Sequence, residues 1–292
     1  MTSESTHERC LLCNHSNLRL MKRYAAQHLV QCANCGFVFA GRIPGTDTLI
    51  QHYEGYGRKN YRSPVTVKRY EELLTIFEKF RKSNRMLDVG CGIGYFLEVA
   101  KANRWEVQGT EYTDEAIRIC REKGLPVHQG VLQVENYEPS SFDVITSFEV
   151  IEHINNPKEE VSKFHSLLRK GGIVYVTTPN FRSLSRLLLR EKWNVIAYPE
   201  HLSYYTQATL NRLFTEAGFS LLSIRTTGLS ITRLKTSLSL SGQSFVSATS
   251  DDERIRETLE SNRLLKMFKS MTNQLLSWFS IGDSIKATFI KN

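Results

Sequence analysis

The feature that most constrains the fold is a glycine-rich turn between a short apolar strand and a helix. Residues 85–89 (RMLDV) are the expected strand, glycines follow at every second position from Gly90 to Gly94, and residues 95–101 (YFLEVAK) are the expected helix. A strand, a glycine turn and a helix in this order open a nucleotide-binding βαβ unit, because glycine lets the backbone approach a ligand closely. The sequence therefore predicts an α/β fold with a parallel sheet.

A carboxylate at the end of the next strand supports this prediction. Glu111 closes the expected strand 106–111, about 20 residues beyond the first glycine, where an acidic side chain accepts hydrogen bonds from ribose hydroxyls. Nicotinamide dinucleotides and S-adenosylmethionine both require such an acid. Glu111 by itself therefore predicts a nucleoside ligand and does not choose between them.

Further motifs make that choice. DVGCGIG (88–94) resembles the first motif of class I methyltransferases, and its G-x-G-x-G spacing departs from the G-x-G-x-x-G of dinucleotide enzymes. SFDVITSFEVIEHI (141–154) resembles the fourth strand and following turn of that family, and FHSLLRKGGIVYVTTP (164–179) its next helix, glycine turn and fifth strand. Residues 199–226 and 282–290 resemble its late segment and seventh strand. The resemblance implies a Rossmann-like seven-stranded sheet with helices on both faces, and S-adenosylmethionine as cofactor.

The same resemblance assigns cofactor contacts residue by residue. The expected contacts are Asp88, Gly90, Cys91, Gly92 and Gly94 for the methionine part, Glu111 for the ribose, Tyr112 for one adenine face, Gly130 and Val131 beside the adenine, and Phe148 with Glu149 at the rim. Family members often carry an acid beside the adenine, and Gly130 and Val131 supply none.

Two histidines are candidates for the catalytic base. If the methyl acceptor is a hydroxyl, a base must take its proton, and histidine has a suitable pKa at neutral pH. His153 follows the fourth strand, and His201 lies in PEHL, after residues 181–198 of a lid-like insert. The resemblance to ubiquinone-type O-methyltransferases also implies that Glu149, Glu152 and His153 hold a divalent ion. The alternative for His153 is a local hydrogen bond at a helix start.

The N-terminal region carries two cysteine pairs with the spacing of a zinc site. Cys10 and Cys13 form one C-x-x-C pair, and Cys32 and Cys35 form the second after 18 intervening residues. Four thiolates fill the tetrahedron of a zinc ion, so the predicted Zn²⁺ is structural and has no open position for chemistry. The stretch 18–31 between the pairs is the expected hairpin. The alternative is a set of buried free thiols.

These motifs define the expected domains. They are a four-cysteine zinc ribbon in 1–45, an aromatic linker and leading helix in 46–82, and a methyltransferase domain in 83–292 that contains a lid-like insert (180–205) and a helical insert (229–281) before the last strand.

Two of these segments have open interpretations. The linker tyrosines resemble an aromatic segment that family members fold over the cofactor site, and they would equally pack two domains together; they are Tyr53, Tyr56 and Tyr61. A helix expected within 252–279 mixes apolar and basic residues, which suits packing on its own core, a homodimer contact, or peripheral contact with an anionic membrane.

The overall composition bounds location and partners. With 41% hydrophobic and 23% charged residues, the chain has the balance of a soluble globular protein. The N-terminus lacks the order of a signal peptide and no apolar run approaches a spanning helix, so a cytoplasmic protein is expected. The net charge of +8 favours phosphate-bearing partners, although no basic block marks a nucleic-acid tail.

The resulting prediction is an S-adenosylmethionine-dependent methyltransferase that methylates an oxygen of a small molecule, a sugar, or a glycan- or lipid-linked metabolite. An RNA methyltransferase is the first alternative, and it would bind with steep salt dependence. A non-catalytic zinc and methyltransferase-fold binding module is the second, which the intact glycine turn and Glu111 disfavour.

Overall fold

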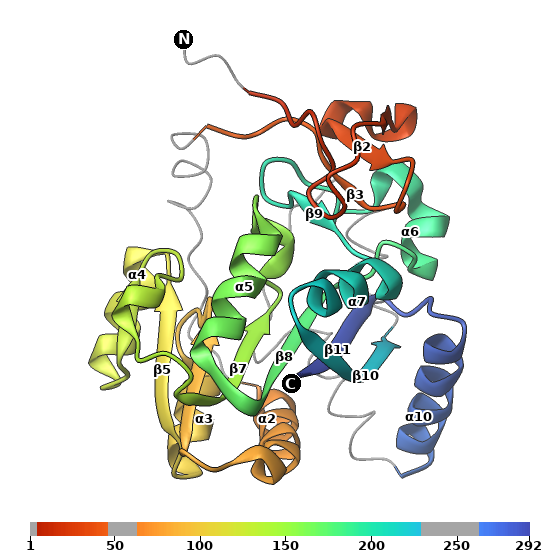
Figure 1. Ribbon diagram of the computed structural model, residues 1–292. Helices are drawn as coiled ribbons and strands as arrows, with labels where there is room; N and C mark the ends of the chain where they lie inside the picture. Colours follow the sequence, from red (N-terminus) through yellow and green to blue (C-terminus); the bar gives the residue numbers. More distant parts are fainter. Residues whose placement is uncertain (1–4, 46–62, 229–262) are drawn as a thin grey trace.

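The computed structural model describes residues 5–45, 63–228 and 263–292, which form a large central sheet and a small sheet beside it (Figure 1). The large sheet has seven strands in the order β10-β11-β8-β7-β4-β5-β6. Its strands in chain order are β4 (Arg85–Val89), β5 (Glu106–Glu111), β6 (Val127–Gln129), β7 (Phe142–Phe148), β8 (Leu168–Pro179), β10 (Phe219–Thr227) and β11 (Ser284–Lys291). This order confirms the expected seven-stranded Rossmann-like sheet.

The directions of the strands predict a ligand-binding crevice at the carboxyl ends of the parallel strands. Strand β4 pairs in parallel with β5 on one side and with β7 on the other, so the strand order reverses at β4. Strand β11 runs antiparallel between β8 and β10. In open α/β sheets ligands bind beyond the carboxyl ends of the strands at such a switch point. The glycine turn that follows β4 lies at this position.

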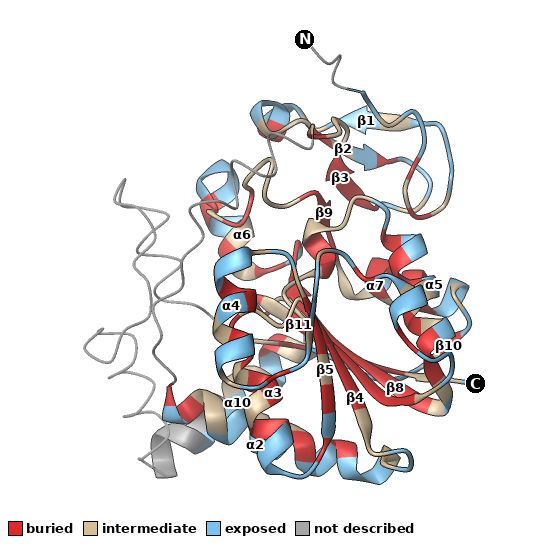
Figure 2. Ribbon diagram, turned by 90° about the vertical axis from the view of Figure 1, so that its left-hand side faces the viewer, coloured by how far each residue is buried: buried red, intermediate tan, exposed pale blue. Residues whose placement is uncertain are grey.

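Helices cover both faces of the large sheet because its central strands are apolar on both sides. Met86 and Val144 pack with the helices α2 and α3, whereas the next residues, Leu87 and Ile145, pack on the opposite face with α5 and α7. Figure 2 shows these strands as largely buried between helices with exposed outer surfaces. The α-helices are α2 (Pro64–Phe77), α3 (Tyr95–Ala102), α4 (Asp114–Glu122), α5 (Pro157–Leu167), α6 (Leu184–Leu189), α7 (Gln207–Glu216) and α10 (Arg263–Trp278).

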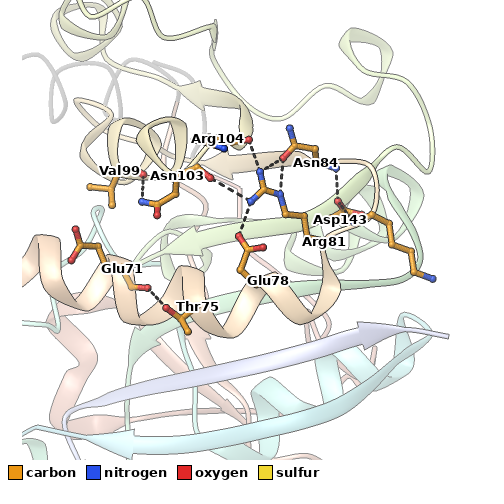
Figure 3. Close-up of polar contacts among 10 residues, drawn as sticks. Glu71, Thr75, Glu78, Arg81, Asn84, Val99, Asn103, Arg104 and Asp143 are labelled. Carbon is orange, nitrogen blue, oxygen red and sulfur yellow. Dashed lines mark hydrogen bonds and ion pairs between the residues drawn. The ribbon is translucent and has the colours of Figure 1, made fainter.

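Helix α2 is anchored to the start of β4 by Arg81. The helix begins after Ser63, whose hydroxyl accepts a hydrogen bond from the Thr66 amide, and it continues into the short 3-10 helix η2 (Glu78–Phe80). The Arg81 guanidinium then donates to Glu78, to the Asn84 side chain and to backbone carbonyls after α3 (Figure 3). This network fixes the strand that leads into the glycine turn.

The small sheet joins the cysteine module to the later lid-like insert. Its order is β1-β2-β3-β9, with the elements β1 (Leu18–Leu20), β2 (Leu29–Cys32), β3 (Val38–Ala40) and β9 (Ser203–Tyr204). Strands β1 and β2 are antiparallel and are connected through the 3-10 helix η1 (Lys22–Gln27), which confirms the expected hairpin. The strand β9 comes from a much later part of the chain, at the end of the lid-like insert, and the sequence did not indicate this pairing.

The remaining short helices lie near the crevice and the insert. They are the 3-10 helices η3 (Val134–Asn136), η4 (Ile151–His153) and η5 (Arg190–Lys192). The linker tyrosines Tyr53, Tyr56 and Tyr61 lie outside the described residues, as does the first part (252–262) of the helix expected within 252–279.

The described part of the late helical insert is α10. Its Asn273 side chain accepts a hydrogen bond from the Gly228 amide, and its Leu276 carbonyl accepts one from the Thr226 hydroxyl, so this side of α10 docks at β10. Apolar side chains remain exposed elsewhere on it, namely Met267, Met271, Leu275 and Trp278. Homodimer and membrane contacts through 252–279 therefore stay predictions. Among the described residues, none of the helices has the length and apolarity needed to span a bilayer.

Candidate cofactor pocket and acceptor site

One cavity lies at the carboxyl ends of β4, β5 and β7. Its volume is about 530 Å³, which is in the range of small-molecule and cofactor sites. Eleven of the residues predicted for catalysis or cofactor binding line it: Asp88, Gly90, Cys91, Gly92, Glu111, Tyr112, Gly130, Val131, Phe148, Glu149 and His153.

 Gly94 and His201 are the two predicted catalytic or cofactor residues that do not line this cavity.

The conformation of the glycine turn is fixed by Glu111, the last residue of β5. One carboxylate oxygen of Glu111 accepts a hydrogen bond of 2.8 Å from the Gly92 amide, and the other accepts from the Tyr112 amide and from Thr113. A carboxylate that accepts backbone N–H groups forms strong, charge-assisted hydrogen bonds. Glu111 thus fixes the shape of the turn as well as lining the cavity.

Asp88 lies at the end of β4 with almost no exposure to solvent. Its carboxylate accepts a hydrogen bond of 2.7 Å from the Thr146 hydroxyl of the neighbouring strand β7. Burial raises the pKa of Asp88 to about 7; the Thr146 bond works against this rise, and the negative charge of Glu111 adds to it. A buried acid of this kind favours a positively charged ligand beside it.

The raised pKa of Asp88 predicts a pH-dependent stability difference. Because the folded pKa lies above the unfolded value of about 3.9, the folded state is favoured at low pH and loses this advantage as the pH rises toward 7. Replacing Asp88 with asparagine removes that loss. The free energy of unfolding of the variant minus that of the wild type should grow by about 2–3 kcal/mol between pH 5 and pH 8. Urea denaturation of the ligand-free proteins measures it, and a constant difference would contradict the buried-acid interpretation.

The far end of the cavity holds features that the motifs did not reveal. Glu149 has a positive φ of 54°, and its amide donates to the Thr177 carbonyl and hydroxyl. A left-handed backbone is uncommon for a residue other than glycine, and such conformations gather at functional sites. Helix α5 contributes Glu159, Glu160 and Lys163 to the wall. In the sequence, only the spacing of the charged residues along this helix could have indicated these three side chains.

The two candidate histidines meet although the sequence separates them by 47 residues. Their rings are edge to face, with centroids 4.7 Å apart. The Nδ1 atom of His153 lies 2.7 Å from the Glu200 carbonyl, and that of His201 lies 2.6 Å from the Val195 carbonyl. A carbonyl only accepts, so each Nδ1 donates a hydrogen bond, which leaves Nε2 as the basic atom of an uncharged ring.

A buried acid completes this histidine group. Glu152 is nearly fully buried and accepts a hydrogen bond of 2.9 Å from the Thr178 hydroxyl. Its carboxylate and a nitrogen of each of His153 and His201 lie within 4.8 Å of one another. The ion site expected from the resemblance used Glu149 with Glu152 and His153, whereas the structure places His201 in that group.

Comparison with known proteins decides the family. The family described as "Methyltransferase domain" matches residues 59–224, more than half of the 292-residue chain. The chain belongs to this family. The expectation of a methyltransferase is thereby confirmed at the level of the family.

Curated relatives of this methyltransferase share part of its length. The ubiquinone biosynthesis O-methyltransferase of Thiobacillus denitrificans is 32% identical over 111 residues, which are 36% of this chain and 48% of that protein. The protein of the same name from Burkholderia vietnamiensis is 31% identical over 158 residues, 52% of this chain and 66% of that protein. The chain thus spans about half to two thirds of the length of these relatives.

Solved structures support the fold of the methyltransferase. A SAM-dependent methyltransferase from Archaeoglobus fulgidus aligns with a TM-score of 0.53 at 17% identity and covers 83% of this chain and 99% of its own. A putative sarcosine dimethylglycine methyltransferase from Galdieria sulphuraria aligns with a TM-score of 0.52 at 15% identity, covering 84% and 98%. At these identities the likeness concerns the fold.

Two glycines of the methyltransferase's turn should respond differently to alanine. A Cβ at Gly94 would lie 2.4 Å from Leu125 Cδ1 and 3.0 Å from Cys120 Sγ, whereas one at Gly92 meets nothing within 4 Å. Both have positive φ, which costs an alanine about 1–2 kcal/mol. Gly94→Ala adds overpacking of about 1–3 kcal/mol and should mainly lower stability. Gly92→Ala should mainly weaken binding of S-adenosylhomocysteine.

Urea denaturation and calorimetric titration of the two glycine variants separate these effects. If Gly92→Ala bound the nucleoside as tightly as the wild type, the open space above Gly92 would not be the cofactor's place.

The four predicted metal ligands of the methyltransferase converge in the N-terminal module. The Cys10 and Cys35 sulfurs are 3.6 Å apart, those of Cys13 and Cys32 are 3.5 Å apart, and all four lie within 4.8 Å of one another. Around a zinc ion with Zn–S bonds of about 2.3 Å, a tetrahedron of sulfurs has edges of about 3.8 Å. The cluster therefore fits the size of a four-thiolate zinc site.

Proposed function

We propose that this methyltransferase transfers a methyl group from S-adenosylmethionine to an oxygen of a small-molecule acceptor. The observation that carries the proposal is a single cavity whose wall includes the glycine turn with Glu111, here called the cofactor end, and His153, here called the acceptor end. A cofactor at the turn and a base at the far end would lie on the same enclosed space. The acceptor class is a small metabolite, a sugar, or a glycan- or lipid-linked compound.

The residues at the glycine end fit the cofactor. Gly92 leaves open space where a side chain would stand, and Glu111 offers carboxylate oxygens for ribose hydroxyls. The buried Asp88 suits the cationic methionine end, since a positive charge beside it would favour the carboxylate form that burial disfavours. S-adenosylmethionine supplies an electrophilic methyl group on a sulfonium. The exposed ring of Tyr112 suits one face of the adenine.

At the acceptor end, His153 is the proposed base. Its Nδ1–H is directed to the Glu200 carbonyl, so Nε2 is the atom that takes the proton from the acceptor hydroxyl. The acceptor oxygen forms its bond to carbon as the carbon–sulfur bond breaks, and the electron pair leaves with the thioether. His201 contacts His153 and does not line the cavity, so we assign it a positioning role.

The four-cysteine cluster is proposed to bind a structural Zn²⁺. Cys10, Cys13, Cys32 and Cys35 would fill all four positions, which leaves no place for an acceptor on the metal. Metal analysis of the purified protein should find one zinc per chain, and Cys32→Ser should lower that content.

Calorimetric titration with S-adenosylmethionine and S-adenosylhomocysteine tests the cofactor site. Micromolar binding is expected, followed by a radiolabelled-methyl screen across sugars, lipids and RNA. Transfer to RNA with steep salt dependence would replace the small-molecule proposal with the nucleic-acid alternative. Tight cofactor binding with no transfer to any extract would instead favour a non-catalytic binding module.

A further inference from the structure

Strand β9 makes the cysteine module and the lid-like insert parts of one sheet. Val38 pairs with Tyr204 and Phe39 with Ser203, in antiparallel register. Just beyond the pairing, the Ala40 amide donates a hydrogen bond of 2.8 Å to the Leu202 carbonyl. The chain between these partners includes the whole parallel part of the large sheet. The module thus supplies the neighbour strand on which the end of the insert (180–205) is built.

Strand β3 carries two buried faces. Val38 and Ala40 pack in an apolar cluster that joins the module to the insert, together with Tyr24 and Leu29 from the module and, from the insert, Phe181, Leu189, Trp193, Val195, Ile196, Leu202 and Tyr204. Phe39 points to the other face and packs in the core of the large sheet. We call the first cluster the module–lid core. It is well packed, because Trp193 is only 1% exposed and Leu29 is fully buried.

The end of the insert in turn forms the acceptor end of the cavity. Leu202 lines the cavity, and its amide donates to the Glu152 carbonyl at 2.8 Å. His201 lies directly against His153. A second link starts in the N-terminal segment, where His7 Nε2 lies 2.9 Å from the Asn155 side chain, which also lines the cavity.

The glycine end is supported differently. The Gly92 amide bonds to Glu111, and the Cys91 amide donates to the Thr110 carbonyl. These contacts join the ends of β4 and β5, which belong to the large sheet. The two ends of one cavity therefore depend on different parts of the chain.

We propose that the four-cysteine module is the positioning unit of the acceptor end: the bound zinc orders β2 and β3, and β3 holds β9, His201 and Leu202 against His153. Loss of the metal loosens the acceptor end and leaves the cofactor end formed. This inference rests on the proposed zinc site and on the proposed acceptor end. It makes the module a determinant of acceptor binding with no contact between metal and acceptor.

The buried Trp193 reports on the module–lid core. The chain has three tryptophans, and a Trp105→Phe, Trp278→Phe background leaves Trp193 as the single emitter. The full-length protein is compared before and after zinc removal with a chelator, with the zinc content measured. We expect a red shift of Trp193 emission, faster hydrogen exchange in 193–206, unchanged exchange in 85–94, and S-adenosylhomocysteine affinity within about three-fold.

A variant pair tests the coupling without touching the cysteines. Leu29→Ala opens a cavity in the module–lid core, whereas Leu74→Ala makes the same truncation of a buried leucine on α2, in an apolar cluster that contains no described residue of the module. Leu29→Ala should shift Trp193 emission and accelerate exchange in 193–206 while the zinc content is kept. Leu74→Ala should leave both readouts as in the parent protein.

The outcomes separate the underlying proposals. If the zinc is removed and neither Trp193 nor 193–206 responds, the positioning role is wrong. If S-adenosylhomocysteine binding is lost along with the metal, the module supports the whole domain and the restricted role is overturned. If the protein holds no zinc, the metal proposal fails, and a silent Leu29→Ala would then overturn the coupling as well.

Discussion

Replacing Glu111 with alanine is expected to weaken binding of S-adenosylhomocysteine by at least about 100-fold. Hydrogen bonds to a charged group contribute about 1.5–3 kcal/mol each, and two ribose hydroxyls would share this carboxylate. Their loss corresponds to about 3–6 kcal/mol, or roughly 10²- to 10⁴-fold in affinity. The variant also removes the acceptor of the Gly92 amide, which lets the glycine turn relax.

The control for this variant is Asp114→Ala. Asp114 opens α4, three residues after Glu111, and does not line the cavity. The Asp114→Ala substitution removes the same charge from the same region but none of the Glu111 contacts. Its affinity for S-adenosylhomocysteine should therefore stay within about three-fold of the wild type. Calorimetric titration measures both variants. If both variants lost affinity for S-adenosylhomocysteine to the same extent, the negative charge in general, and not the Glu111 contacts, would govern binding.

Replacing His153 with alanine is expected to lower kcat by about 10²- to 10⁴-fold, the usual contribution of a general base. The affinity for S-adenosylhomocysteine should not change, because the glycine end is built from other residues. His201→Ala should lower kcat less, since His201 contacts the His153 ring without lining the cavity. Full turnover in His153→Ala with normal cofactor binding would refute the base.

A divalent ion at the histidine group would give a different pattern. Glu152, His153 and His201 offer a carboxylate and two imidazoles within 4.8 Å, and each histidine directs its Nδ1 to a backbone carbonyl, as metal-bound histidines commonly do. Turnover would then require added metal and would fail equally in His153→Ala and His201→Ala. Unequal losses with turnover in the presence of a chelator support the base instead.

Local signals in the sequence were sufficient for the fold and for the cofactor end of the site. The strand, the three spaced glycines and the helix are adjacent in the chain, so their geometry follows from backbone preferences over about ten residues. Glu111 follows at the spacing that one βα unit imposes. The two cysteine pairs converge because each pair forms its own tight turn. These predictions needed no knowledge of distant contacts.

The acceptor end was decided by tertiary structure. His153 and His201 were separate candidates in the sequence, and their contact arises because β9 returns to pair with β3 and lies against the turn after β7. The Asp88–Thr146 hydrogen bond likewise joins two strands whose register no local pattern encodes. The helices, strands and glycine turn could thus be predicted from local patterns, since short-range backbone geometry controls them. The contact of the cysteine module with the proposed acceptor end could not, because pairing between distant strands depends on how whole elements pack.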